Sequence, residues 1–85
     1  MILDKELFLD VAELYDDIGH SVFENEAGLT KAVERYDGIV LSSIDNYISC
    51  SFGDNIKGRF TKNSDGYFEL ITLEVVVDKE ILMIM

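Results

Sequence analysis

"GIVLSSIDNYISCSF", residues 38–52, decides how the rest of this chain can fold. The segments 38–44 and 47–52 are rich in β-branched and aromatic residues, and the pair Asp45-Asn46 between them forms a short polar break. Two such segments joined by so short a break predict an antiparallel hairpin. The pattern of the remaining residues extends this hairpin toward the C-terminus.

Further strands are predicted after the hairpin. Residues 56–62, "IKGRFTK", alternate between inward apolar and outward polar side chains, as a strand with one solvent-exposed face does. The turns and strands that follow are "NSDG" (63–66), "YFELITLEVVV" (67–77), "DKE" (78–80) and "ILMIM" (81–85). Strands joined by such short turns form an antiparallel meander.

The chain before Gly38 has a helical period instead. In residues 4–18, apolar side chains recur every three or four positions, at Leu7, Val11, Leu14, Tyr15 and Ile18. Asp4 is suited to cap the start of this helix and Gly19 to end it. This part of the chain therefore predicts an amphipathic helix with one face toward the sheet.

A second, shorter helical pattern follows. Ser21–Glu24 has the form of a capping box. The apolar residues after it are Leu29, Ala32, Val33 and Tyr36. One bent helix and two separate helices both fit this pattern. Residues 1–85 thus predict a single acidic α+β domain, with an N-terminal helix or helix pair packed on one face of an antiparallel four- to five-stranded meander sheet.

Negative charge is concentrated in the helical part. The 85 residues include 17 acidic and 7 basic ones, which gives a net charge of −10. Residues 1–37 contain ten acids and three bases, whereas residues 38–66 contain three of each. A surface this acidic repels nucleic acid and anionic lipid and attracts basic proteins. We expect no direct binding to nucleic acid or membrane, and solubility alone is the alternative explanation of the charge.

Cysteine usage and the first residues bear on the compartment. Cys50 is the single cysteine, so an intrachain disulfide is excluded. The first residues lack the basic and apolar regions of a signal peptide, and no apolar run approaches the roughly 18 residues that span a bilayer. These features predict a cytoplasmic protein.

The sequence lacks the combinations of residues that catalysis requires. His20 is the single histidine and lies at a helix end, and Cys50 lies mid-strand, where a buried hydrophobic role is typical. Asn63 and Asp65 resemble part of a calcium loop, but the glutamate required downstream is missing. We therefore predict a protein that is not an enzyme and needs no cofactor or metal.

Four carboxylates on the first helix form what we call the acidic row: Glu6, Asp10, Glu13 and Asp17. Their spacings of four, three and four place them on one face, over about 16 Å of helix. Like charges so spaced destabilise an isolated helix by a few tenths of a kcal/mol per pair. The alternative is a merely solvated face, but a row of anions also resembles a phosphate backbone.

Size and charge together are similar to those of small acidic blocking proteins, although no residue motif supports the comparison. This class includes nucleic-acid mimics, viral anti-CRISPR and other anti-defence inhibitors, and immunity proteins of nuclease toxins. The leading hypothesis is an inhibitor that binds a basic, nucleic-acid-handling protein. Its contact residues would be the acidic row, Glu24 and Glu26, with Tyr15 and Tyr36 as aromatic anchors. The alternative is a structural or adaptor subunit that self-associates, for example as a homodimer, through its apolar C-terminal strand.

Overall fold

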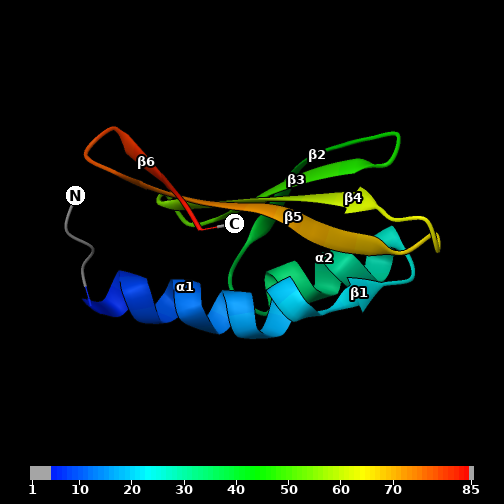
Figure 1. Ribbon diagram of the computed structural model, residues 1–85, viewed down its shortest axis with the longest axis horizontal. Helices are drawn as coiled ribbons and strands as arrows, with labels where there is room; N and C mark the ends of the chain where they lie inside the picture. The colour runs from blue at the N-terminus through cyan, green and yellow to red at the C-terminus, as the bar shows by residue number, and fades with distance from the viewer. Residues whose placement is uncertain (1–4, 85) are drawn as a thin grey trace.

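The computed structural model describes residues 5–84, so the expected helix cap Asp4 and the last residue, Met85, lie outside the described part. Two helices, a short 3₁₀ turn and six strands follow one another along the chain (Figure 1). They are α1 (Lys5–Asp17), η1 (Ile18–His20), β1 (Val22–Phe23), α2 (Glu26–Glu34), β2 (Ile39–Ile44), β3 (Tyr47–Phe52), β4 (Ile56–Lys62), β5 (Phe68–Val77) and β6 (Glu80–Met83).

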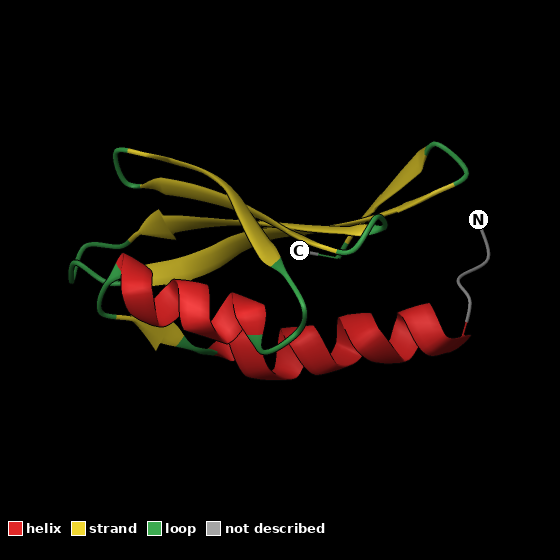
Figure 2. Ribbon diagram, turned by 180° about the vertical axis from the view of Figure 1, so that it is seen from behind, coloured by secondary structure: helices red, strands yellow, loops and turns green. Residues whose placement is uncertain are grey.

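Strands β2 to β6 form the predicted meander, in which each strand pairs antiparallel with the next. Both helices lie on the same face of this sheet (Figure 2), which confirms the α+β prediction. The sequence did not predict β1, which pairs through Val22 and Phe23 with the start of β5. Two residues are too few to show an alternation, so this sixth strand left no pattern in the sequence.

The connection between the helices differs from the prediction. Helix α1 ends at Asp17 and tightens into η1, which contains Gly19. The Ser21 hydroxyl donates a hydrogen bond of 2.7 Å to the Asp17 carbonyl, so it closes the end of α1 and does not cap α2. The expected capping box is therefore wrong. Asn25 caps α2 instead, since its side-chain oxygen accepts a 2.9 Å hydrogen bond from the Gly28 amide.

The core lies between the helices and the sheet face that they cover. Its most completely buried side chains are Ile18, Leu29, Val33, Ile48, Cys50, Phe60, Leu73 and Val75. Removing one large apolar side chain of this kind from water stabilises the fold by about 1.5–3 kcal/mol. Among the described residues no polar or charged residue is buried, so the interior is held by apolar packing and by the backbone hydrogen bonds of the sheet.

The C-terminal strand is paired but largely exposed. The predicted strand is confirmed for β6, where Leu82 pairs with Val75 and Ile81 with Val76. Ile81, Leu82 and Met83 nevertheless remain 62%, 37% and 54% exposed, and of this segment Ile84 is the residue that packs against the core. Apolar surface therefore faces solvent at this edge of the sheet.

Helix α2 ends in a Schellman motif, and strand β2 begins directly after it. The amide of Asp37 donates to the Glu34 carbonyl and that of Gly38 to the Val33 carbonyl, both at 3.0 Å. Asp37 takes the left-handed conformation, with φ at 57°, a position that tolerates aspartate. Gly38 follows in a tight space, where an added Cβ would lie 2.7 Å from side-chain carbons of both Val33 and Phe52. This close approach brings α2 against the sheet.

Replacing Gly38 by alanine should destabilise the fold by about 1–3 kcal/mol, the usual cost of overpacking a well-filled core. Gly28→Ala is the matched control, because a Cβ there meets only the Asn25 side-chain oxygen, at an ordinary 3.5 Å. The control should be neutral or stabilising by up to about 1 kcal/mol, since alanine favours a helix over glycine. Urea unfolding of both variants measures the difference, and equal stability would show that the Gly38 contact is unimportant.

Cys50 is a core residue whose thiol should be unreactive in the native state. It is 1% exposed, and burial raises the pKa of its thiol to about 12. Its Sγ lies within hydrogen-bonding distance, 3.6 Å, of the Gly58 carbonyl oxygen. The thiolate is the reactive form, so labelling by a thiol reagent at neutral pH should proceed only through opening of the fold. Rapid labelling under conditions where circular dichroism shows the native fold would contradict this assignment.

Candidate protein-binding surface

The acidic row lies along the side of α1 that does not pack against the core. Glu6, Asp10 and Glu13 are exposed, whereas Asp17 is half-buried at the end of the helix. The buried residues of the same helix are Val11 and Leu14, which lie on the neighbouring side, roughly 100° around the helix from the centre of the acidic row. The prediction that these acids share one face is therefore consistent with the burial pattern of the helix.

Beside this row the structure has a groove of about 270 Å³, which we call the acidic groove. Three structural parts line it: α1, the segment after α2, and the two ends of the β3–β4 turn. The lining residues are Asp10, Glu13, Leu14, Arg35, Tyr36, Asp37, Phe52 and Ile56. Leu14, Phe52 and Ile56 are buried core residues, so the groove has an apolar floor below a charged rim.

The rim of the acidic groove has a net negative charge. Asp10 and Glu13 come from α1 and Asp37 comes from the Schellman motif, against a single guanidinium, that of Arg35. All four are exposed. The close spacing of the carboxylates gives a local negative potential, and an apolar wall beside them strengthens their interaction with a cation relative to open water.

A hydrogen bond between Tyr36 and Asp17 lies beside the acidic groove and joins two of the chain segments that line it. The Tyr36 hydroxyl donates to Oδ2 of Asp17 at 2.5 Å, which ties the end of α1 to the segment after α2. This bond is the main cause that raises the pKa of Tyr36 to about 12. Burial and the negative charges of Asp17 and Glu13 act in the same direction, and Arg35 opposes them. Tyr36 is therefore held as a neutral phenol with a fixed orientation.

The structure does not bring all of the predicted contact residues together. Tyr15 packs its ring edge against His20, with centroids 5.0 Å apart at 77°, and is not part of the groove lining. Glu26 lies in the first turn of α2, at the opposite end of this helix from the groove, which is about 12 Å away along the axis. Glu24 precedes it in the connection from β1. Glu6 lies one turn before Asp10, beyond the groove.

Sequence reasoning missed the contributions of Arg35, Asp37, Phe52 and Ile56 to the site. Phe52 lies at the end of a predicted strand, and Ile56 was expected to face inward, but neither pattern shows that the β3–β4 turn lies beside α1. Tertiary packing alone brings these positions to Asp10 and Glu13, so no local signal in the sequence could have identified the groove.

The described part of the chain shows neither a metal-binding cluster nor a membrane-spanning helix. Among residues 5–84, no group of three His, Cys, Asp or Glu side chains is placed to hold a metal ion. In the same described range no helix is long and apolar enough to cross a membrane. No protein-family model, curated protein or solved structure matches the chain. The function must therefore be inferred from the surface of the molecule.

The bond to Asp17 should make Tyr36 the last of the four tyrosines to ionise. An ultraviolet titration of the native protein should show one phenol with a pKa near 12, and Tyr36→Phe should remove that phase. Asp17→Asn should lower this pKa, because the carboxylate charge is gone.

The same bond links pH to stability. The pKa of Tyr36 in the folded protein lies above its ordinary value of 10.0. The stability that this hydrogen bond contributes is therefore fully present below pH 10 and is lost as the pH rises through about 12. A late phase that persists in Tyr36→Phe would show that another tyrosine carries it.

Proposed function

We propose that the protein acts without catalysis, by binding a basic protein partner through the acidic groove and the acidic row beside it. The main support for the proposal is that one groove combines three carboxylates, an apolar floor and Tyr36, whose phenol is held in one orientation by its hydrogen bond to Asp17. Carboxylates attract a cationic side chain, the apolar floor accepts its aliphatic stem, and the aromatic ring of Tyr36 can lie against its charged group. None of this requires a cofactor or a metal.

The size of the groove favours a side chain over a small molecule. Pockets for drug-sized ligands hold about 300–1,000 Å³, and the 270 Å³ groove lies below that range. An arginine suits the site better than a lysine, because its planar guanidinium can bind two carboxylate oxygens at once and stack on an aromatic ring. A surface arginine of the partner is the anchor that we propose.

A nucleic-acid-handling protein is the partner class that best fits the acidic row. Proteins that hold DNA or RNA present rows of arginine and lysine, spaced for phosphates a few ångströms apart. The carboxylates of α1 repeat along the helix at every turn and would occupy such a row in place of phosphate. The protein would thereby inhibit the partner, as nucleic-acid mimics, anti-defence inhibitors and immunity proteins do. A cytoplasmic location is part of this proposal and is supported by the free, buried Cys50.

One observation favours the alternative, a self-associating structural or adaptor subunit. Ile81 and Met83 of β6 are more than half exposed at an edge of the sheet, and an apolar edge of this kind can add a further strand. The alternative places the functional contact on the sheet and leaves the acidic groove unused.

Binding of an arginine-rich peptide tests the groove directly. We expect the Asp10→Asn/Glu13→Gln protein to bind such a peptide at least about tenfold more weakly than the parent, because two of three rim carboxylates are gone. Glu24→Gln/Glu26→Gln is the matched control, since it also removes two exposed acids and yields the same net charge. The control should bind like the parent, as measured by isothermal titration calorimetry.

Three further outcomes complete this test. Binding by the parent should weaken as salt rises, because the contact is between exposed charges. Thermal unfolding of the Asp10→Asn/Glu13→Gln protein should occur at the parent's temperature or slightly above it, since repulsion along α1 is relieved. Equal loss of binding in both double variants would mean that net charge alone attracts the peptide, and would refute the groove as a specific site.

A further inference from the structure

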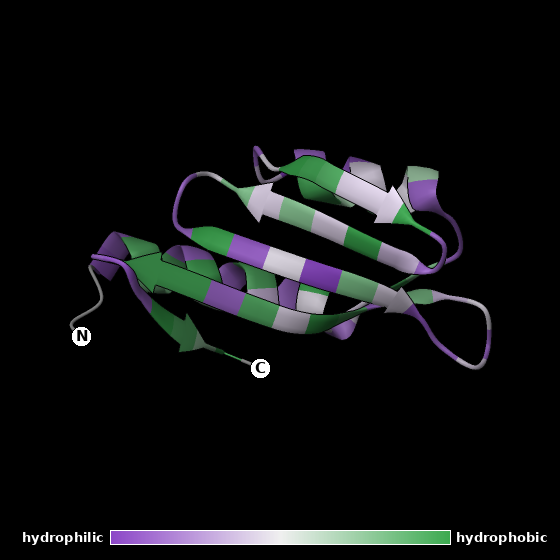
Figure 3. Cartoon of the chain, turned by 90° about the horizontal axis from the view of Figure 1, so that it is seen from above, coloured by the Kyte–Doolittle hydropathy of each residue, from purple (hydrophilic) through white to green (hydrophobic). Residues whose placement is uncertain are grey.

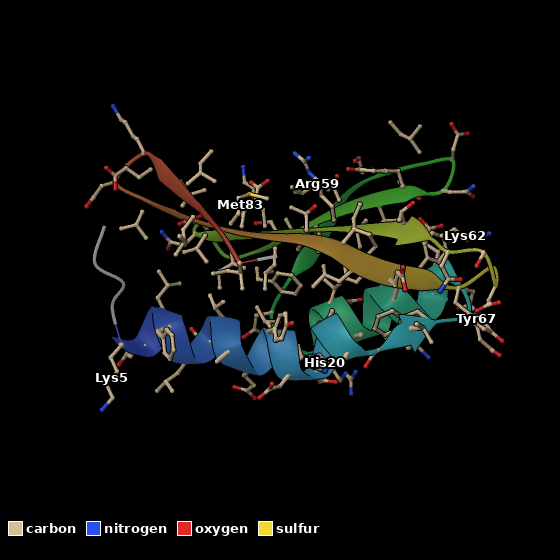
Figure 4. All side chains as sticks on the ribbon, viewed as in Figure 1. Lys5, His20, Arg59, Lys62, Tyr67 and Met83 are labelled. Atoms are coloured by element: carbon tan, nitrogen blue, oxygen red, sulfur yellow. The ribbon has the colours of Figure 1, made fainter. Side chains whose placement is uncertain are left out.

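The face of the sheet that points away from the helices, which we call the open face, is not covered by any other part of residues 5–84 (Figure 2). Arg59 and Met83 point outward from it (Figure 4). Viewed from above, both outer strands, β2 and β6, contain hydrophobic residues (Figure 3). The two edges of the sheet differ in charge, and this difference indicates what each can bind.

Strand β2 forms an edge with little protection against pairing. Within the described residues it pairs with β3 alone, so its outer backbone groups have no strand partner. It contains no charged residue and no proline, and Ile39, Leu41 and Ile44 are 62%, 54% and 68% exposed. In soluble proteins, charged residues, proline or a bulge usually prevent an edge strand from pairing with another chain. Of these features β2 has only a bulge, at Leu41.

The bulge gives β2 a palindromic arrangement of side chains. Ile39 pairs with Ser51 and Ile44 with Tyr47, which places both isoleucines on the open face. Ser42, opposite Ser49, is also on the open face, as is Leu41, which lines a shallow hollow with Ser49, Lys57 and Arg59. Val40 and Ser43 pair with Cys50 and Ile48 on the helix-covered side. The order open, covered, open, open, covered, open reads the same in both directions.

The order of side chains in β2 is compatible with pairing of two copies about a two-fold axis. If two copies of β2 pair antiparallel about a point between Leu41 and Ser42, Ile39 of one copy lies opposite Ile44 of the other. Val40 then lies opposite Ser43, so every residue meets one that points to the same face. A strand without the bulge meets the same condition about an axis through a residue, so the bulge sets where the axis lies and is compatible with self-pairing.

The distribution of charge also favours β2 over β6 as the contact between two copies. Two chains of net charge −10 repel each other, so they associate most easily where the local charge is least negative. Residues 38–66 have a net charge of zero, whereas residues 67–85, which include β6, contain four acids and one base. Lys57 and Arg59 add positive charge to the open face two strands from β2.

We propose that β2 is a homodimerisation edge, which pairs antiparallel with β2 of a second copy to form one continuous sheet. The two-fold axis is normal to the sheet, so the helices of both copies lie on the same side. Cross-strand contacts between Ile39 and Ile44 of the two copies, on either side of Leu41, form an apolar strip over the junction. This proposal does not depend on the acidic groove and can succeed or fail without it.

Sedimentation equilibrium over a range of concentrations tests the proposal with two matched variants. Ile39→Lys and Ile81→Lys introduce the same residue, at positions of equal exposure, on opposite edges of one sheet. Both variants lower the net negative charge, which by itself would favour association. We expect a dimer for the parent and for Ile81→Lys, and a dimer dissociation constant at least about tenfold higher for Ile39→Lys.

The salt dependence separates this contact from the one at the groove. Dimerisation should strengthen as salt rises, because screening reduces repulsion between like-charged copies, whereas peptide binding at the groove should weaken. Amide hydrogen exchange in residues 39–44 should be slower at concentrations where the dimer forms, and exchange in residues 80–83 should not change.

Four results would overturn the proposal. They are a parent protein that is monomeric at every concentration, a dimer that Ile39→Lys leaves intact, a dimer that Ile81→Lys also dissociates, and new amide protection confined to residues 80–83. Circular dichroism should confirm that both variants are folded, as expected for substitutions at positions that are 62% exposed.

Discussion

Packing of the two helices against a single face of the sheet is the constraint on which the rest of this structure depends. Ile18 and the α2 residues Leu29 and Val33 belong to one buried cluster with Ile48 and Phe60 of the sheet, and each of these side chains is at most 1% exposed. The Schellman motif and the tight space at Gly38 let α2 lie close enough for this contact. A sheet covered on one side must leave its other side in water, and the open face and its exposed edges follow directly.

The same packing creates the acidic groove. Leu14 anchors α1 to the core, and the hydrogen bond from Tyr36 to Asp17 fixes the end of that helix beside the segment after α2. Asp10 and Glu13 are therefore held on a rigid element next to Asp37. Fixed carboxylates lose less conformational entropy on binding than flexible ones, which favours a specific contact over a diffuse attraction.

Local patterns predicted the sheet better than the helix ends. Alternation in 47–52 and 56–62 matches β3 and β4, because a strand with one buried face repeats every two residues. The N-cap of α2 was missed because Ser21 and Asn25 both have cap chemistry, and only the path of the chain decides between them. The acidic row was visible as a spacing on one helix. The groove was not, since Asp37, Phe52 and Ile56 reach it through tertiary contacts between segments distant in sequence.

The high negative charge also controls how the exposed apolar residues of this protein behave in solution. Ile39, Ile44 and Ile81 are each more than 60% exposed, a composition that would favour precipitation in a neutral molecule. At neutral pH, mutual repulsion between chains of charge −10 opposes nonspecific aggregation. Near the isoelectric point of about 4.2 this repulsion vanishes while the apolar edges remain. The carboxylates thus act as a colloidal stabiliser, and acidification toward the isoelectric point removes that protection.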